Sequence, residues 1–209
     1  MIRALIYDLD NTIYPVKSIS DELFAELFSL MDEYADGVDQ SDIAAAKEEV
    51  TRRPFQKIAD EYSFDDELKQ KAIEHLRQLT YDKPMQAFDD YKYVKSLQVD
   101  KFLVTTGFVK LQTSKVKMLD LDNDFKQIYI VDPDTTDKTK RHIFLEILKK
   151  YNYSKDEVLV VGDDPESEIK EAKAIGIKTV LYDPERQYTN NDADYLISNH
   201  REVEELLLK

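Results

Sequence analysis

Six short apolar runs recur along the chain, and segments with helical periodicity separate most of them. Runs this short, without polar alternation, are typical of strands that are buried on both faces. Strands that alternate with helices predict a parallel sheet with helices on both sides. The sequence therefore predicts an α/β fold with a Rossmann-like parallel sheet, whose expected strands are Ile2–Tyr7, Phe102–Thr105, Ile128–Val131, Val158–Val161, Thr179–Tyr182 and Tyr195–Ile197.

Residues 16–82 interrupt this alternation, because nothing in them has the pattern of a strand. Amphipathic periodicity instead predicts four helices there, at residues 23–34, 43–50, 54–62 and 68–79. Outside this segment, apolar spacing predicts helices through residues 143–151 and from Pro165 to Gly176. We therefore expect an α/β core domain at residues 1–15 and 83–209 and an inserted α-helical cap domain at residues 16–82.

The composition limits the classes of function. The chain has 209 residues, of which 42% are apolar, and no cysteine, which excludes a disulfide scaffold and a cysteine nucleophile. The formal net charge of −14 argues against a nucleic acid polymer as partner. No apolar run approaches a membrane span, and the first is too short for a signal peptide, so we expect a cytoplasmic protein with no membrane partner. An anionic substrate would need local cations to offset this charge.

Polar side chains follow the first four expected strands. In an open α/β sheet, ligands bind at the carboxyl ends of the strands. Carboxylates at Asp8 and Asp163 are suited to share Mg²⁺, which prefers oxygen ligands, while a lysine and a threonine beside them can hold phosphate oxygens. A carboxylate can also attack phosphorus, and Asp10 can serve as general acid and then general base. The polar residues at the four strand ends are Asp8, Asp10 and Thr12; Thr105, Thr106 and Gly107; Lys138 and Lys140; and Asp163, Asp164 and Glu168.

Each of these clusters also has a structural interpretation. The two aspartates can cap a turn, the threonines can end a strand, and the lysine and the glutamate can be solvated. A calcium loop that begins at Asp8 is excluded, because its sixth residue is Ile13 rather than glycine and its twelfth is Ile19 rather than glutamate. The clusters occur together, which favours the functional interpretation. The three histidines, His75, His142 and His200, lie far apart and form no ligand pattern.

Four motifs, in this order, resemble the haloacid dehalogenase (HAD) superfamily of phosphohydrolases. Asp8-Leu9-Asp10-Asn11-Thr12 matches D-x-D-x-T, FLVTTG matches the second motif, KTKRHIF the third, and VGDDPESEIKEAKAIG the fourth. The resemblance covers the α/β core and implies that the helical insertion is a cap. It implies Asp8 as nucleophile, Asp10 as acid and base, and Lys138 beside Asp8. It further implies that Thr105, Thr106 and Gly107 bind the phosphoryl group and that Asp8, the Asp10 carbonyl and Asp163 bind Mg²⁺.

Several positions depart from the family pattern or have a rival. Thr106 stands where many relatives have asparagine, and Glu168 where aspartate is common. Lys140 is a rival for the lysine role, although the spacing favours Lys138. Three further positions are in question. Asp164 is expected to cap the helix that begins at Pro165. Arg52 and Arg53 are expected on a solvated face, with binding of an anionic substrate as the alternative.

The second aspartate of the first motif favours phosphoryl transfer over dehalogenation, because a halide leaving group needs no proton. We expect hydrolysis of a small-molecule phosphate ester. The stretch DLDNTIYP followed by a small helical cap is similar to the pyrimidine 5′-nucleotidase-like branch, which implies a nucleoside 5′-monophosphate. The alternatives are a sugar-phosphate or phosphoglycolate phosphatase, a phosphomutase, and a non-catalytic binding protein on the same fold.

Overall fold

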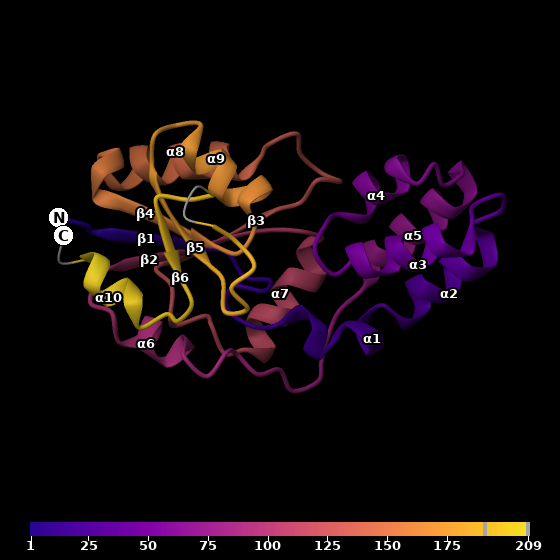
Figure 1. Ribbon diagram of the computed structural model, residues 1–209, viewed down its shortest axis with the longest axis horizontal. Coiled ribbons are helices and arrows are strands. Elements are labelled where there is room, and N and C mark those ends of the chain that lie inside the picture. The colour runs from indigo at the N-terminus through magenta and orange to yellow at the C-terminus, as the bar shows by residue number, and fades with distance from the viewer. Residues whose placement is uncertain (190–191, 208–209) are drawn as a thin grey trace.

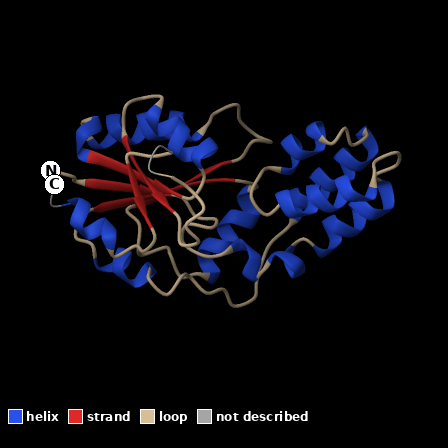
Figure 2. Cartoon of the chain, viewed as in Figure 1, coloured by secondary structure: helices blue, strands red, loops and turns tan. Residues whose placement is uncertain are grey.

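A computed structural model describes residues 1–189 and 192–207 and contains a six-stranded, all-parallel sheet in the order β3-β2-β1-β4-β5-β6. Figures 1 and 2 show the sheet with helices on both sides. The predicted α/β class and all six predicted strands are confirmed, with ends that differ by two residues at most. The strands are β1 (Ala4–Tyr7), β2 (Asp100–Thr106), β3 (Gln127–Val131), β4 (Val158–Gly162), β5 (Lys178–Tyr182) and β6 (Tyr195–Ile197).

Alternate residues of the central strand face opposite layers of the core, as the two-residue period of a strand requires. Ala4 and Ile6 pack in one hydrophobic cluster with residues of α8 (Lys140–Tyr151) and α9 (Lys170–Lys173). Leu5 and Tyr7 pack in another with residues of the remaining core helices. Those helices are α6 (Tyr91–Ser96), α7 (Val109–Met118) and α10 (Glu202–Leu207). Burial on both faces explains why the strands read as continuous apolar runs.

The segment after β1 is helical, and its helices lie to one side of the sheet in Figure 1. The prediction of a single helix at residues 23–34 is wrong in one respect, because the helix breaks at Phe24, whose backbone leaves the helical range. Leu27 and Met31 are buried together with Leu68 and Ala72 of the last helix of the segment. The elements are a 3₁₀ turn (Val16–Ser18), α1 (Ser20–Leu23), α2 (Ala25–Tyr34), α3 (Gln40–Glu49), α4 (Phe55–Glu61) and α5 (Asp66–Gln78).

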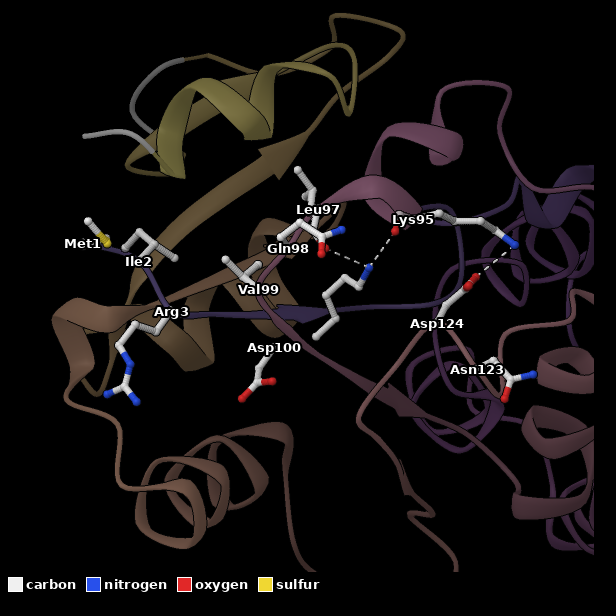
Figure 3. Close-up of a pocket in the computed structure, with 11 residues that line it drawn as sticks. Met1, Ile2, Arg3, Lys95, Leu97, Gln98, Val99, Asp100, Asn123 and Asp124 are labelled. Atoms are coloured by element: carbon white, nitrogen blue, oxygen red, sulfur yellow. Dashed lines mark hydrogen bonds and ion pairs between the residues drawn. The ribbon is translucent and has the colours of Figure 1, made fainter.

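A polar hollow lies at the amino ends of β1 and β2 and is drawn in Figure 3. Across it, Lys95 reaches Asp124 at 3.1 Å. The buried Lys101 in its lining donates from Nζ to the carbonyls of Val94 and Lys95, at 2.9 and 3.1 Å, so it caps the end of α6. The hollow is therefore on the edge of the sheet opposite the predicted site.

No helix among the described residues is long and apolar enough to cross a membrane.

Candidate active site

The strand order reverses between β1 and β4, because the chain builds β2 and β3 on one side of β1 before crossing to β4 on the other. A sheet of this type opens a crevice at such a switch point, outside the carboxyl ends of the strands. Asp8 follows β1, and its backbone N–H donates to the Val161 carbonyl of β4 at 3.0 Å. Asp163 follows β4, and its Oδ1 accepts from the Thr12 hydroxyl at 3.2 Å. The two predicted metal-binding carboxylates are thus brought to one place.

A buried lysine joins the carboxylates of this crevice. Lys140 Nζ donates to Asp8 Oδ1 and to Glu168 Oε2, at 2.7 Å each. All three side chains are less than 10% exposed, so the ion pairs are shielded from water and hold the groups in fixed positions. Burial lowers the pKa of Lys140, but Asp8 and Glu168 outweigh this effect and raise it, which keeps the lysine charged.

The prediction that Lys138 lies beside Asp8 is wrong, because Lys140 occupies that position. Lys138 is exposed, and its backbone N–H donates to the Thr136 hydroxyl at 3.2 Å in the loop ahead of α8. Helix α8 begins at Lys140, with Thr139 as its N-cap in a capping box closed by His142. The first residue of α8, Lys140, is the one that reaches the crevice. Motif spacing predicted this lysine two residues too early, at Lys138.

A glycine allows Glu168 to enter the crevice. A Cβ atom at Gly162 would lie 2.0 Å from Glu168 Oε1, which is impossible without a shift of that carboxylate. Glu168 Oε1 also accepts from the Asp164 backbone N–H at 3.0 Å. The prediction that Asp164 caps the following helix is confirmed, since its side chain accepts from the Glu166 N–H at 2.8 Å. Glu168 is therefore held by Lys140 and by backbone rather than solvated.

The donor set of the crevice fits a divalent cation. One carboxylate oxygen from each of Asp8, Asp163 and Glu168 lies within 4.8 Å of the others. Burial, partly offset by Lys140 and reinforced by Glu168, raises the pKa of Asp8 to about 7. Burial together with Glu168 and Asp8 raises the pKa of Asp163 well above its ordinary value. Three buried acids around one lysine leave unbalanced negative charge, and hard oxygen ligands are those that Mg²⁺ prefers. Both oxygens of Glu168 are engaged, Oε2 by Lys140 and Oε1 by the Asp164 N–H, whereas Lys140 contacts Asp8 through Oδ1 alone, so we expect Asp8 and Asp163 to be the carboxylates that face an ion.

Asp10 lies apart from this cluster and has its own set of partners. Asp10 Oδ1 accepts from the Tyr14 hydroxyl at 2.5 Å and from Lys115 Nζ at 2.7 Å, and Oδ2 accepts from Gln112 Nε2 at 2.7 Å. Burial raises the pKa of Asp10, but Lys115 and the hydrogen bonds outweigh it and hold the pKa below its ordinary value. Sequence reasoning missed Tyr14, Gln112 and Lys115. The available signal was a glutamine and a lysine spaced three residues apart, within a helix whose other inward residues are apolar.

The predicted phosphoryl-binding residues follow β2. The Thr105 hydroxyl is buried and lies 2.6 Å from Gln112 Nε2, and the Thr106 carbonyl lies 3.4 Å from the same nitrogen. The Gly107 N–H donates to the Val131 carbonyl at 3.0 Å, so this predicted backbone donor is already used. Gly107 has φ of +153° and a Cβ there would lie 3.0 Å from the Gln112 side chain, which explains the glycine. Of the three predicted residues, Thr105 is therefore the one that brings a buried side-chain hydroxyl to this end of β2.

One arginine of the helical segment reaches the crevice. Arg52 lies between α3 and α4, and its Nη2 is 3.5 Å from Asp163 Oδ2 and 3.4 Å from the Tyr188 hydroxyl. Arg53 instead pairs with Glu49 and Glu61 within the helical segment. Arg52 is exposed, as expected of a solvated face, and its guanidinium is also a cation that lies beside the acids.

The chain is similar to curated phosphatases. It is 32% identical over 111 residues to glyceraldehyde 3-phosphate phosphatase of Pyrococcus furiosus, covering 50% of this chain and 46% of that one. Identity to the Methanopyrus kandleri protein of the same name is 23%, over 97% and 96% of the two chains. Identity to ribulose-1,5-bisphosphate 5-phosphatase of Halopiger xanaduensis is 28%, over 52% and 50%. The match thus spans about half the length of the first of these relatives.

Solved structures share the whole architecture. The magnesium-bound structure of YfnB from Bacillus subtilis superposes with a TM-score of 0.67 at 21% identity, covering 99% and 98% of the two chains. The 2-haloacid dehalogenase of Pseudomonas syringae pv. tomato gives 0.58 at 17%, covering 100% and 99%. At these identities the likeness shows the fold alone. A family model described as haloacid dehalogenase-like hydrolase matches residues 2–176.

Proposed function

Since the chain belongs to the haloacid dehalogenase-like hydrolase family, we propose that it is a Mg²⁺-dependent phosphatase that hydrolyses a small phosphate monoester through an aspartyl-phosphate. The observation that carries the proposal is the buried contact of Asp8 with Lys140, at 2.7 Å, beside Asp163. A structural pair needs no third carboxylate, whereas a nucleophile that meets an anionic ester needs both an orienting cation and a metal site.

Asp10 has a lowered pKa, so it takes up a proton from solvent as the anionic ester binds. In the first step, an Asp8 oxygen forms a bond to phosphorus, the bond from phosphorus to the leaving oxygen breaks, and Asp10 gives this proton to that oxygen. Lys140 holds Asp8 in place and offsets charge, and the Thr105 hydroxyl donates to a phosphoryl oxygen. In the second step, a water oxygen bonds to phosphorus, its proton passes to Asp10, and the bond to Asp8 breaks. Inorganic phosphate leaves, and both carboxyl groups return to their starting state.

Asp8, Asp163 and the Asp10 carbonyl are the groups we assign to Mg²⁺, with Glu168 holding Lys140 beside them. When bound, the ion supplies positive charge against the phosphoryl oxygens and fixes their orientation. This assignment also answers the charge problem of an acidic protein with an anionic substrate, since Lys140 and Arg52 add cations at the same place.

We assign the helical segment at residues 16–82 to a cap over this crevice. Supporting contacts tie it to the core: Arg52 lies beside Asp163, and Arg77 of α5 pairs with Asp134 in the loop after β3 through two bonds, at 2.5 and 2.9 Å. A cap that closes over a site excludes water and presents residues that select the substrate.

The substrate class we propose is a sugar phosphate. The relatives named above act, by their names, on glyceraldehyde 3-phosphate and on ribulose 1,5-bisphosphate, which favours such a substrate over the nucleoside monophosphate suggested by the sequence alone. Arg52 is the cap residue placed to meet an anionic ester as it enters.

The test of the reaction is release of p-nitrophenol from p-nitrophenyl phosphate with Mg²⁺, with chelator, and with Asp8→Asn. Turnover should need Mg²⁺ and fall by about 10⁴-fold in the variant, because an amide is a far poorer nucleophile of the same shape. Turnover that survives in Asp8→Asn would mean that another residue is the nucleophile. Absence of turnover in the wild type would favour a non-catalytic binding protein, and transfer of phosphate between sugars without its release would favour a mutase.

The test of the substrate is a panel of sugar phosphates, phosphoglycolate and nucleoside monophosphates. We expect Arg52→Gln to raise KM for the preferred sugar phosphate by about tenfold, an amount equal to one charge-assisted contact. Arg53→Gln is the matched control and should leave KM unchanged. A preference for nucleoside monophosphates would overturn the proposed substrate class while leaving the reaction intact.

A further inference from the structure

Three buried polar side chains surround Asp10 in a way that the roles assigned so far do not require. Tyr14, Gln112 and Lys115 are 0%, 2% and 4% exposed, respectively. Burying a lysine and a glutamine on an inward helix face is costly unless each is fully paired, and an apolar residue would fill either position at less cost. Their placement therefore needs a reason beyond packing.

The three side chains converge on one carboxyl group. Lys115 and Tyr14 both donate to Asp10 Oδ1, and Gln112 donates to Oδ2. The Lys115 ammonium also lies 5.7 Å from the centre of the Tyr14 ring, where the ring face attracts a cation. Both oxygens of Asp10 are thereby fixed in direction, by partners that are themselves locked by burial.

Gln112 extends this arrangement to Thr105. Its nitrogen faces Asp10 because an ionised carboxylate can only accept, and the same nitrogen lies 2.6 Å from the Thr105 hydroxyl oxygen. The hydroxyl oxygen thus accepts from Gln112, which leaves the proton of Thr105 free to donate elsewhere. One amide orients both the acid–base carboxyl group and the hydroxyl assigned to the phosphoryl group.

We propose that Lys115, Gln112 and Tyr14 are positioning residues, which aim Asp10 at the leaving oxygen in the first step and at water in the second. This inference rests on the proposed phosphatase mechanism and goes beyond it. Without these three residues, the Asp10 carboxyl group can still exchange a proton, but its orientation is no longer fixed, so both proton transfers become inefficient. General acid–base catalysis of this kind contributes about 10²- to 10⁴-fold in rate.

Leaving-group dependence separates positioning from a structural role. The p-nitrophenolate ion leaves without a proton, whereas the alkoxide of glycerol 2-phosphate needs one. We expect Lys115→Met to lower kcat/KM for glycerol 2-phosphate by about 100-fold and to slow the first turnover of p-nitrophenyl phosphate much less. Because water activation is also impaired, p-nitrophenol should appear as a burst equal to the enzyme concentration, followed by a slow steady state.

Two further variants serve as a control and as an independent test. Lys117→Met removes an exposed lysine from the same helix and should change neither the burst nor the ratio of the two substrates. Tyr14→Phe removes one hydroxyl with little change in packing, and should show the same burst in weaker form even if Lys115→Met folds poorly. A circular dichroism melt of each variant reports its folding.

The outcomes separate the two proposals. Equal loss for both substrates, with no burst in either Lys115→Met or Tyr14→Phe, overturns the positioning role while the wild-type turnover and the Asp8→Asn control still support the mechanism. Absence of Mg²⁺-dependent turnover in the wild type overturns the mechanism, and the positioning role falls with it.

Discussion

The two carboxylates of the first motif lie in opposite electrostatic surroundings, although only Leu9 separates them. Around Asp8, three buried acids meet two cations, because Lys140 contacts Asp8 and Glu168 and the half-exposed Arg52 lies beside Asp163, so the region carries excess negative charge. Around Asp10, one acid meets one lysine and two neutral donors, so the region is balanced. We call these the open half and the paired half of the site. On the proposed function, we expect the open half to be completed by a cation from solution, while the paired half is complete within the chain.

The largest expected effect is in the open half, where Lys140 is a buried cation in contact with two of the acids. Lys140→Met leaves Asp8 and Glu168 buried without their counter-charge, which should lower turnover by about 10³-fold and the free energy of unfolding by roughly 3 kcal/mol. Lys138→Met, two residues away and exposed, should change the free energy of unfolding by less than about 0.5 kcal/mol. Phosphatase assays and urea titrations measure both. Loss of turnover in Lys138→Met alone would restore the assignment made from spacing.

These lysines show what sequence reasoning could and could not reach. The strands, the helical insertion and the acidic residues at the strand ends follow from periodicity and from local motifs, so they were predictable. The choice of Lys140 over Lys138 depends on the residue at which α8 begins, and the ends of helices are set by capping contacts such as that of Thr139 with His142. Lys115 meets Asp10 across a separation of 105 residues, and nothing local to either residue encodes that contact.

The second prediction compares the effect of an aspartate-to-asparagine substitution on the melting temperature in each half of the site. Without metal, Asp163→Asn should raise the melting temperature, because it removes one of three repelling buried acids. Asp10→Asn should lower the melting temperature, because it leaves Lys115 buried without a partner. Each change is expected to be about 1 to 3 kcal/mol in the free energy of unfolding.

Added Mg²⁺ should then narrow the difference in melting temperature between the two variants. At about 100 times its dissociation constant it stabilises the wild type by roughly 2.7 kcal/mol, or about 5–10 °C in a chain of this size. Asp163→Asn should lose this shift and Asp10→Asn should keep it, because the asparagine retains the backbone carbonyl. Thermal melts of the wild type and both variants, with and without Mg²⁺, measure all six melting temperatures. Equal shifts in both variants would remove the distinction between the halves.

The smallest expected effect concerns His200, which contacts the segment after β1 that carries both Asp8 and Asp10. His200 is fully buried and stacks on Tyr182 with ring centres 4.0 Å apart, and its Nε2 lies 2.8 Å from the Thr12 carbonyl, to which it must donate. Its Nδ1 has no hydrogen-bond partner among the described residues, so the ring has no acceptor for a second proton there. Burial, only partly offset by Asp90, lowers the pKa of His200 from its ordinary 6.5.

The sign of the pH dependence follows from this direction. Below pH 6.5 the unfolded chain binds a proton at His200 that the folded chain does not, so the stability contributed by the neutral ring is present above that pH and declines as the pH falls. The free-energy advantage of the wild type over His200→Gln should therefore shrink between pH 7 and pH 5, by at most about 1.4 kcal/mol per pH unit. Urea titrations at the two pH values measure it, and the comparison of two variants cancels the opposing titration of Asp8 and Asp163. A constant difference would mean that His200 takes up its proton in the folded protein, and the Thr12 carbonyl would then be held by a charged ring rather than a neutral one.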